Sequence, residues 1–394
     1  MSEILIGPPR LEGGRLCADI TQDGATKTCW FKTSDKYSKY LVAERIDAFL
    51  VGLIPLIARS GGKASSRAPV SAYLKHNLEH VLANTLPLFD KSLSPLEISA
   101  PIDDTNFHPE HVGTGASCGI DSMATLAEYS TSDTPRALKI DTLAFFDVGS
   151  HGDVENASNQ EREKRDQLAR GRKANVENFA REVALPLMEV ESNIYEFGGG
   201  FKHINIHTFR SASAVLALGK MFSAYHYASA YLISEFKLSS KALAKADEFL
   251  LRCLSTESTR FYSALPSLSR QDRTKIVASF APAKKYLNVC VTEVDNCGKC
   301  FKCVRTMFQL ELEGALDEFS QVFDVESYKK RRAKTLHTIG KDVNYHREYL
   351  KELKENPGRI PYGKFRFRLA LLKGALSRKF VAARKKMFSS GGKA

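Results

Sequence analysis

The sequence lacks the features of a secreted or membrane-spanning protein. Its N-terminus, MSEILIGPPR, does not show the basic-then-apolar order of a signal peptide. The longest apolar run, residues 48–58, contains Pro55 and is too short to cross a bilayer. Eight cysteines in 394 residues are too few for a disulfide scaffold, which favours a reducing compartment. We therefore expect a soluble, cytoplasmic protein.

Two common phosphate-binding patterns are also missing. The sequence contains no GxxxxGK[ST] run, and no GxGxxG opens a strand-to-helix unit. The P-loop NTPases and the Rossmann dehydrogenases are excluded on this ground. Internal repeats and low-complexity tracts are absent as well.

Acidic residues are scarce only near the C-terminus. Residues 329–394 hold 20 Lys and Arg against 4 Asp and Glu, a net charge of +16. The whole chain carries +12, so residues 1–328 carry −4. Basic side chains interleave with apolar ones between Lys364 and Phe388. This tail can bind RNA, lie on an anionic membrane surface or pack on its own domain.

The length predicts two domains and a tail. Residues 1–105 read as a small α+β module, in which Ser71 is a candidate helix cap. Its predicted strands are 16–20, 27–33 and 96–102, and its predicted helices are 40–58 and 70–86. The proline-punctuated loop 101–109 marks the boundary.

Strand-like and helical segments alternate in residues 106–328, which favours an α/β domain with helices on both faces of a parallel sheet. The predicted strands are 111–116, 140–146, 187–191 and 221–225. The predicted helices are 121–130, 159–183 and 211–220. Residues 329–394 form a predicted basic helical extension.

A candidate phosphate loop occupies residues 115–123, between the first of these strands and the helix after it. Backbone N–H groups and the helix dipole create an anion site in such a position. The hydroxyls of Ser117 and Ser122 can donate hydrogen bonds to phosphate oxygens. The alternative is an ordinary turn in which Asp121 or Ser122 caps the helix.

Four cysteines cluster near the end of the second domain. Cys297, Cys300 and Cys303 are separated by two-residue gaps, and Cys290 lies seven positions before the first of them. Four thiolates complete a tetrahedral zinc ion, so the expected role is structural. The alternatives are an iron–sulfur cluster and buried cysteines without a metal.

The run Ser117-Cys118-Gly119-Ile120-Asp121-Ser122 resembles the Ser-Gly-Gly-x-Asp-Ser loop of the PP-loop ATP pyrophosphatases. The departure is Cys118, where glycine is usual. Together with the cysteine cluster, the loop makes roughly residues 110–325 similar to the 7-cyano-7-deazaguanine synthase-like branch of that superfamily. The true synthase is much shorter than this chain, so its named substrate is not carried over.

The resemblance implies a PP-loop α/β domain that binds ATP and Mg²⁺. It implies that Ser117, Gly119 and Ser122 hold the pyrophosphate and that Asp121 positions Mg²⁺. Adenine is expected beside Phe146 and Asp147. Cys118 completes the set of expected cofactor-binding residues. The catalytic candidates are Asp121, Ser122 and Arg270. The expected zinc ligands are Cys290, Cys297, Cys300 and Cys303. Arg273 is an alternative to Arg270 as the cation for a phosphate.

The expected activity is that of a ligase-like enzyme that adenylates a carboxylate or amide of a small-molecule substrate for attack by ammonia or an amine. One alternative is sulfur transfer to a nucleic acid, as in tRNA modification, with Cys118 or a metal-bound cysteine in use. Another is a non-catalytic nucleotide-binding adaptor in a biosynthetic or defence complex. A homodimer is a candidate assembly.

Overall fold

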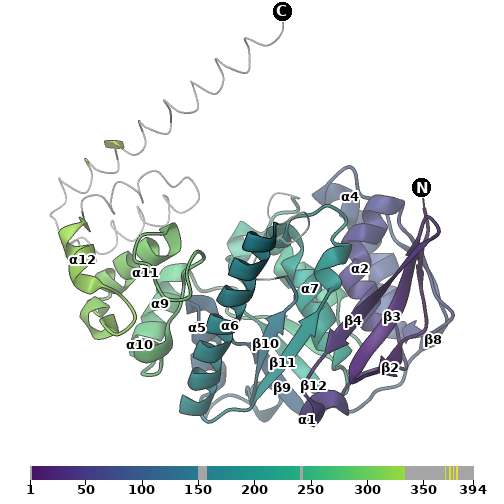
Figure 1. The fold of residues 1–394 in the computed structure, drawn as a ribbon, viewed down its shortest axis with the longest axis horizontal. Helices are drawn as coiled ribbons and strands as arrows, with labels where there is room; N and C mark the ends of the chain where they lie inside the picture. The colour runs from purple at the N-terminus through teal and green to yellow at the C-terminus, as the bar shows by residue number, and fades with distance from the viewer. Residues whose placement is uncertain are drawn as a thin grey trace, which may run out of the picture. The chain divides into compact units, whose positions relative to one another are not determined.

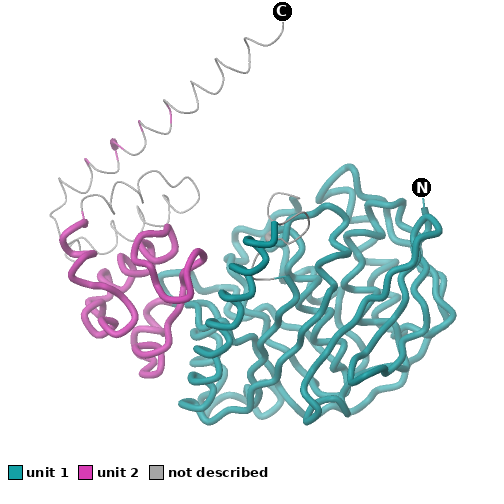
Figure 2. The backbone as a smooth tube through the Cα atoms, viewed as in Figure 1, with its two compact units in different colours: residues 1–273 teal, residues 274–394 magenta. Residues whose placement is uncertain are grey.

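The computed structural model describes residues 2–149, 158–239 and 243–332, and beyond them Leu369, Leu372, Lys373, Leu376 and Lys379. The chain divides into two compact units, Met1–Arg273 and Thr274–Ala394 (Figure 2). Most of the predicted basic extension, residues 333–394, lies outside the described residues, so its secondary structure stays a prediction.

Unit 1 is built on a parallel sheet whose strands follow the predicted alternation with helices (Figure 1). The predicted α/β class with a mostly parallel sheet is confirmed. Neighbouring strands pair in the order β13-β12-β9-β10-β11, all of them parallel. The strands are β9 (His111–Gly115), β10 (Thr142–Asp147), β11 (Leu187–Ser192), β12 (Phe222–Tyr227) and β13 (Arg260–Ser263).

The strand order reverses between β9 and β12. Successive strands proceed outward from β9 through β10 to β11, and the chain then returns to add β12 and β13 on the other side of β9. Open α/β sheets bind ligands at such a point, outside the carboxyl ends of the strands. The loop after β9 is the candidate phosphate loop.

The N-terminal strands extend the same sheet. Strand β4 pairs antiparallel with β11, and further pairings in the order β4-β3-β1-β5-β7 give eleven strands within the described residues, with β2 paired to β3. These strands are β1 (Ile4–Ile6), β2 (Arg10–Glu12), β3 (Arg15–Gln22), β4 (Ala25–Lys32), β5 (Lys63–Ser65) and β7 (Glu97–Ser99). The compact units divide at residue 273. The predicted domain limits of 105 and 328 stay a prediction. Strand β4 satisfies the backbone edge that β11 would otherwise expose.

A long hydrophobic core lies under the helices of the N-terminal half. Helices α2 (Asp47–Ser60) and α7 (His203–Ala217) pack closely, and Ser213 Oγ donates to the carbonyl of Ala48 at 2.6 Å. Gly52 permits this approach, because a Cβ there would lie 2.8 Å from Ser213 Oγ. Helix α2 begins at Asp47 rather than at the predicted residue 40, since Val42 N and Ile46 N donate to distant carbonyls instead.

Two of the remaining helices of unit 1, α3 and α6, begin at a side-chain cap. Ser71 Oγ accepts from Leu74 N at the start of α3 (Ala72–Asn77), which continues through π and 3-10 turns into α4 (Leu86–Phe89). Ser158 and Glu161 form a capping box on α6 (Asn159–Glu182), which runs alongside β10 in Figure 1. The other helices are α1 (Asp35–Ser38), α5 (Ile120–Tyr129) and α8 (Asp247–Cys253), and a small sheet pairs β6 (Val70–Ser71) with β8 (Ile102–Asp103).

Unit 2 is helical in its described part. It contains α10 (Ala283–Tyr286), α11 (Phe301–Leu312) and α12 (Val325–Lys330), while α9 (Arg270–Ser279) begins in unit 1. The cysteine-rich loop connects α10 to α11. Across the described residues of both units, no helix combines the length and the apolar character needed to cross a membrane.

Candidate functional site

The two loop serines converge at the N-terminus of α5. Ser117 Oγ and Ser122 Oγ lie 3.0 Å apart. Gly119, the N-cap residue, donates its N–H to Ser117 Oγ at 3.3 Å and accepts from Ser122 Oγ at 3.1 Å. Hydroxyl groups and the first N–H groups of a helix are thus gathered in the arrangement that favours an anion.

Cys118 occupies the one strained position of this loop. Its φ is +54°, a left-handed conformation that glycine adopts without steric cost and other residues rarely adopt. Its side chain is buried, at 1% exposure, and burial raises the pKa of the thiol well above its usual value. Cys118 therefore adopts a backbone conformation that suits glycine and holds a protonated thiol inside the protein.

Two arginines reach the first turn of α5 from far along the chain. Arg270 Nη1 donates to Asp121 Oδ2 at 2.5 Å, and Arg273 Nη1 donates to Asp121 Oδ1 at 3.0 Å. A capping box aligns them, because Ser269 Oγ donates to Asp272 Oδ2 and accepts from Asp272 N at the start of α9. Residues three apart share a helix face, so both guanidinium groups face Asp121.

Arg273 is anchored on three sides. Its Nη2 donates to the carbonyl of Leu265 at 2.9 Å, its Nη1 also donates to the carbonyl of Ser229, and its side chain is 2% exposed. Ser229 follows β12, and its hydroxyl accepts from Ser263 Oγ at 2.8 Å at the end of β13. The loop, the two arginines and the ends of β12 and β13 thus meet where the strand order reverses.

Phe146 and Asp147 lie at the carboxyl end of β10, beside the loop. Ala144 pairs with Gly115 in the sheet, so the next residues of β10 extend along the beginning of the loop. The Phe146 ring stacks on Tyr225 with 6.0 Å between centroids, and Arg165 Nη2 donates to Asp147 Oδ1. The sequence-predicted adenine residues therefore border the predicted phosphate residues.

Sequence reasoning missed a buried carboxyl next to this region. Asp247 is 2% exposed, and its Oδ1 accepts from Thr208 Oγ1 at 2.7 Å. Burial raises the pKa of Asp247 to about 7 although the hydrogen bond from Thr208 lowers it. Nearby, His207 Nδ1 and the Tyr227 hydroxyl lie 2.6 Å apart. No local pattern could have identified Asp247, because an acidic residue in the first turn of a helix is common.

The four cysteines of unit 2 form one cluster. Their Sγ atoms all lie within 4.8 Å of one another, and those of Cys290 and Cys300 are 3.9 Å apart. A tetrahedron with metal–sulfur bonds of about 2.3 Å has edges of about 3.8 Å, so the cluster can hold a metal ion such as zinc. An iron–sulfur cluster would separate its cysteines further, because several metal atoms lie between them.

Backbone conformation and hydrogen bonds of the loop hold the four cysteines close together. Gly298, with φ +65°, makes the tight turn after Cys297, whose Sγ accepts from Cys300 N at 3.2 Å. Asn296 braces the loop, since its Nδ2 donates to Leu287 O at 2.7 Å and to Val322 O at 3.0 Å. Burial raises the pKa of the Cys303 thiol, so a bound cation is needed to keep all four sulfurs ionised.

Glu257 lies in a separate network. Its carboxylate accepts from Ser71 Oγ at 2.6 Å and from Tyr73 N at 2.7 Å, and it pairs with the buried Arg45 at 3.3 Å. Arg45 also pairs with Asp47. These contacts tie α3 to the segment before β13, which is a structural role.

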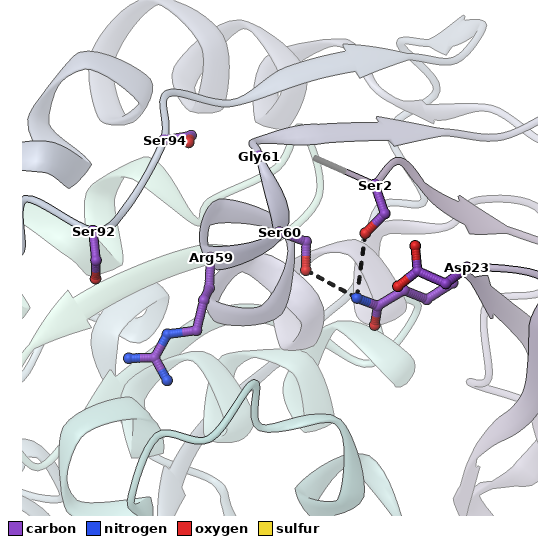
Figure 3. A pocket seen from close by; sticks show the side chains of 8 residues that line it. Ser2, Asp23, Arg59, Ser60, Gly61, Ser92 and Ser94 are labelled. Carbon is purple, nitrogen blue, oxygen red and sulfur yellow. Dashed lines mark hydrogen bonds between the residues drawn. The ribbon is translucent and has the colours of Figure 1, made fainter.

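An open pocket of about 620 Å³ lies at the C-terminal end of α2 (Figure 3). Hydroxyl-bearing and charged residues line it, and Gln22 Nε2 donates to Ser60 Oγ at 3.1 Å across it. None of the predicted site residues is among its lining residues, which are Ser2, Gln22, Asp23, Arg59, Ser60, Gly61, Ser92 and Ser94. The pocket therefore does not extend the phosphate-loop site.

Comparison with known proteins gives no indication of the function of this chain, so any assignment depends on its residues. No family model, curated protein or solved structure matches this chain significantly.

Proposed function

We propose that this protein is an ATP-dependent adenylating enzyme of the PP-loop type, which releases pyrophosphate and retains AMP on its substrate. The observation that carries the proposal is the convergence of Arg270 and Arg273 on Asp121, beside the loop at the start of α5. Two guanidinium charges and one carboxylate leave a net positive charge at a helix N-terminus. Phosphate groups bind at such positions.

The proposed reaction follows from this charge. An oxygen of the substrate carboxylate or amide attacks the α-phosphorus of ATP, and the bond to the bridging oxygen breaks with its electrons on the departing pyrophosphate. Arg270, at 12% exposure, and the hydroxyls of Ser117 and Ser122 stabilise that leaving group. Ammonia or an amine then displaces AMP, forming the new bond to nitrogen.

Asp121 acts mainly through the arginines in this arrangement. Each of its oxygens accepts a hydrogen bond from a guanidinium group, and two cations beside it disfavour a divalent metal ion there. Mg²⁺ is a cofactor in the proposal because it enters with the ATP phosphates, whose oxygens it prefers. No step is assigned to a metal ion at Asp121.

The metal of the cysteine cluster is proposed to be zinc with a structural role. Four thiolates leave no open coordination position for a substrate. Within unit 2 the cluster holds the loop between α10 and α11, which has few regular backbone hydrogen bonds of its own. Its metal is expected to stabilise unit 2 rather than to take part in the reaction.

The test is the product of ATP turnover. Purified protein incubated with ATP, Mg²⁺ and cell extract is expected to form AMP and pyrophosphate, and mass spectrometry would identify the adenylated substrate. Arg270→Gln and Ser122→Ala should each lower pyrophosphate release by about 10². The matched control is Arg252→Gln, at an exposed position of α8, which should leave turnover unchanged.

ADP and phosphate as products would contradict the proposal, because they require attack at the γ-phosphorus. ATP binding without turnover in any extract would favour the adaptor. Transfer of labelled sulfur to RNA would favour tRNA modification, for which the buried thiol of Cys118 provides no support. Each variant's thermal unfolding must be measured alongside, because the arginines also join α9 to α5.

A further inference from the structure

Two histidines lie on one face of helix α7. His203 is the first residue of the helix, and His207 follows one turn later. The centroids of the two rings are 5.9 Å apart, and both side chains are half-buried. Neither histidine takes part in the reaction as proposed above.

Arg210 determines which ring nitrogen of His203 carries the proton. Arg210 Nη1 and His203 Nδ1 are 3.2 Å apart, and a guanidinium group can only donate a hydrogen bond. His203 Nδ1 is therefore the acceptor, and a positive charge on the ring is disfavoured beside the arginine. The neutral ring of His203 then carries its proton on Nε2.

The Tyr227 hydroxyl has the same effect on His207. Its oxygen lies 2.6 Å from His207 Nδ1. Burial raises the pKa of Tyr227, and the nearby Asp247 raises it further, so the tyrosine keeps its proton. With Tyr227 donating to Nδ1, the neutral ring of His207 also carries its proton on Nε2.

The histidine pair is anchored at the carboxyl end of the parallel sheet. Tyr227 is the last residue of β12. Arg210 approaches the segment after β10, because a Cβ on Gly149 would lie 2.9 Å from its Nη1. Strand β9 lies between β10 and β12, and the phosphate loop follows β9. The two Nε2–H groups therefore belong to the edge of the sheet at which the strand order reverses.

We propose that His203 and His207 donate hydrogen bonds from Nε2 to the acyl oxygen of the substrate. This inference rests on the proposed function and assigns the residues that bind the reacting carboxyl group. One carboxylate oxygen forms the bond to the α-phosphorus, and the pyrophosphate departs with the electrons of the broken bond. The other oxygen stays on the acyl carbon, where it accepts from the two histidines.

The same donors favour the second step of the reaction. When the nitrogen nucleophile attacks the acyl carbon, negative charge develops on the retained oxygen. Fixed N–H donors stabilise such a charge more than they stabilise the neutral carbonyl group. Collapse of this intermediate returns the charge to the carbonyl bond and expels AMP. His203 and His207 thus act as hydrogen-bond donors and not as bases.

The experiment follows both steps in the full chain. Wild type and variants are incubated with ATP, Mg²⁺, isotopically labelled ammonium chloride and the small-molecule fraction of cell extract. Pyrophosphate, the adenylated substrate and the labelled product are then measured. The variant His203→Leu with His207→Leu should form labelled product at least about 10²-fold more slowly. The matched control is His76→Leu with His80→Leu, an exposed histidine pair at the same spacing.

Glutamine separates donation from proton transfer. A glutamine amide keeps an N–H donor but does not accept a proton at neutral pH. The variant His203→Gln with His207→Gln should therefore stay within about tenfold of the wild type. Nitrogen NMR of the wild type should show Nε2 protonated in both histidines, and circular dichroism establishes that each variant has folded.

Three results would overturn the inference while leaving the proposed function in place. The first is wild-type formation of labelled product by the leucine variant. The second is a glutamine variant as slow as the leucine variant, which would make a histidine the base. The third is a proton on Nδ1 of either histidine in the wild type. Absence of pyrophosphate release from the wild type would contradict the proposed function and this inference together.

Discussion

The cysteine cluster and the phosphate-loop site differ in how far apart their parts lie in the sequence. All four cysteines fall within residues 290–303, whereas Asp121 contacts residues that are 149 and 152 positions away. The cluster is specified by a local turn and by the spacing of its cysteines. The phosphate-loop site is specified by the sheet, which brings the ends of β9, β12 and β13 together. Local chemistry can therefore be read from spacing, while the cations of the loop site depend on the topology.

Removing a cysteine ligand should give the largest effect. Cys300→Ser is expected to lose the metal and to unfold the described helical part of unit 2, because a structural zinc site contributes on the order of 10 kcal/mol to folding. Unit 1 should remain folded, since its core is its own. Metal analysis and limited proteolysis measure both outcomes.

The control for this prediction is Lys299→Ala, which changes a neighbour of two ligands but no ligand. It should keep about one zinc per chain. Retention of zinc and of a protease-resistant unit 2 in Cys300→Ser would show that the cluster does not organise this unit. Iron with acid-labile sulfide in the wild type would show that the metal has been misassigned.

The sequence was sufficient for the parts of the fold that depend on local pattern. Four of the five parallel strands were predicted, because buried strands read as short apolar runs between turn signals. Strand β13, Arg260–Ser263, was not predicted, since only one of its four residues is fully buried. Helix α7 begins at His203, eight residues before the predicted start, because its first turns contain polar residues and histidines.

The candidate site shows the same limit. The loop serines and the four cysteines follow from residue type and spacing. The pairing of Asp121 with both arginines does not follow from residue type and spacing. Nothing in the sequence around Asp121 points to the segment that contains Arg270 and Arg273. The joining of the N-terminal strands to the parallel sheet is equally non-local, because it rests on the antiparallel pairing of β4 with β11. These features required the three-dimensional structure.

An effect of intermediate size on stability is expected from substituting Asp247. Its contact with Thr208 also depends on the fold. Its pKa is about 7 in the folded protein against 3.8 for an ordinary Asp, so its stabilising contribution is complete below pH 3.8 and is lost as the pH rises to about 7. Asp247→Asn does not ionise, so it should abolish this pH-dependent loss of stability, which amounts to at most about 4 kcal/mol. Urea unfolding of both proteins at several pH values between these limits measures it.

The prediction would be wrong if the free energies of unfolding of the wild type and of Asp247→Asn changed in parallel across this pH range. That result would mean that Asp247 is ionised in the folded protein and paired in a way that the Thr208 hydroxyl alone does not explain. Glu248→Gln, at the exposed neighbouring position of α8, is the control and should leave the pH dependence unchanged.

The smallest effect on stability and activity is expected from substituting Cys118. The two regions contain two kinds of thiol. Sulfurs of the cluster are gathered to hold a cation, whereas the Cys118 thiol is buried alone with its pKa raised. Alanine retains the same left-handed backbone and loses one sulfur contact, so Cys118→Ala should change stability by only about 1 kcal/mol. Release of pyrophosphate should stay close to that of the wild type, because only backbone shape is required of this residue. Loss of labelled-sulfur transfer in this variant, with ATP binding and unfolding unchanged, would instead make Cys118 a sulfur carrier and the protein a nucleic-acid thiolating enzyme.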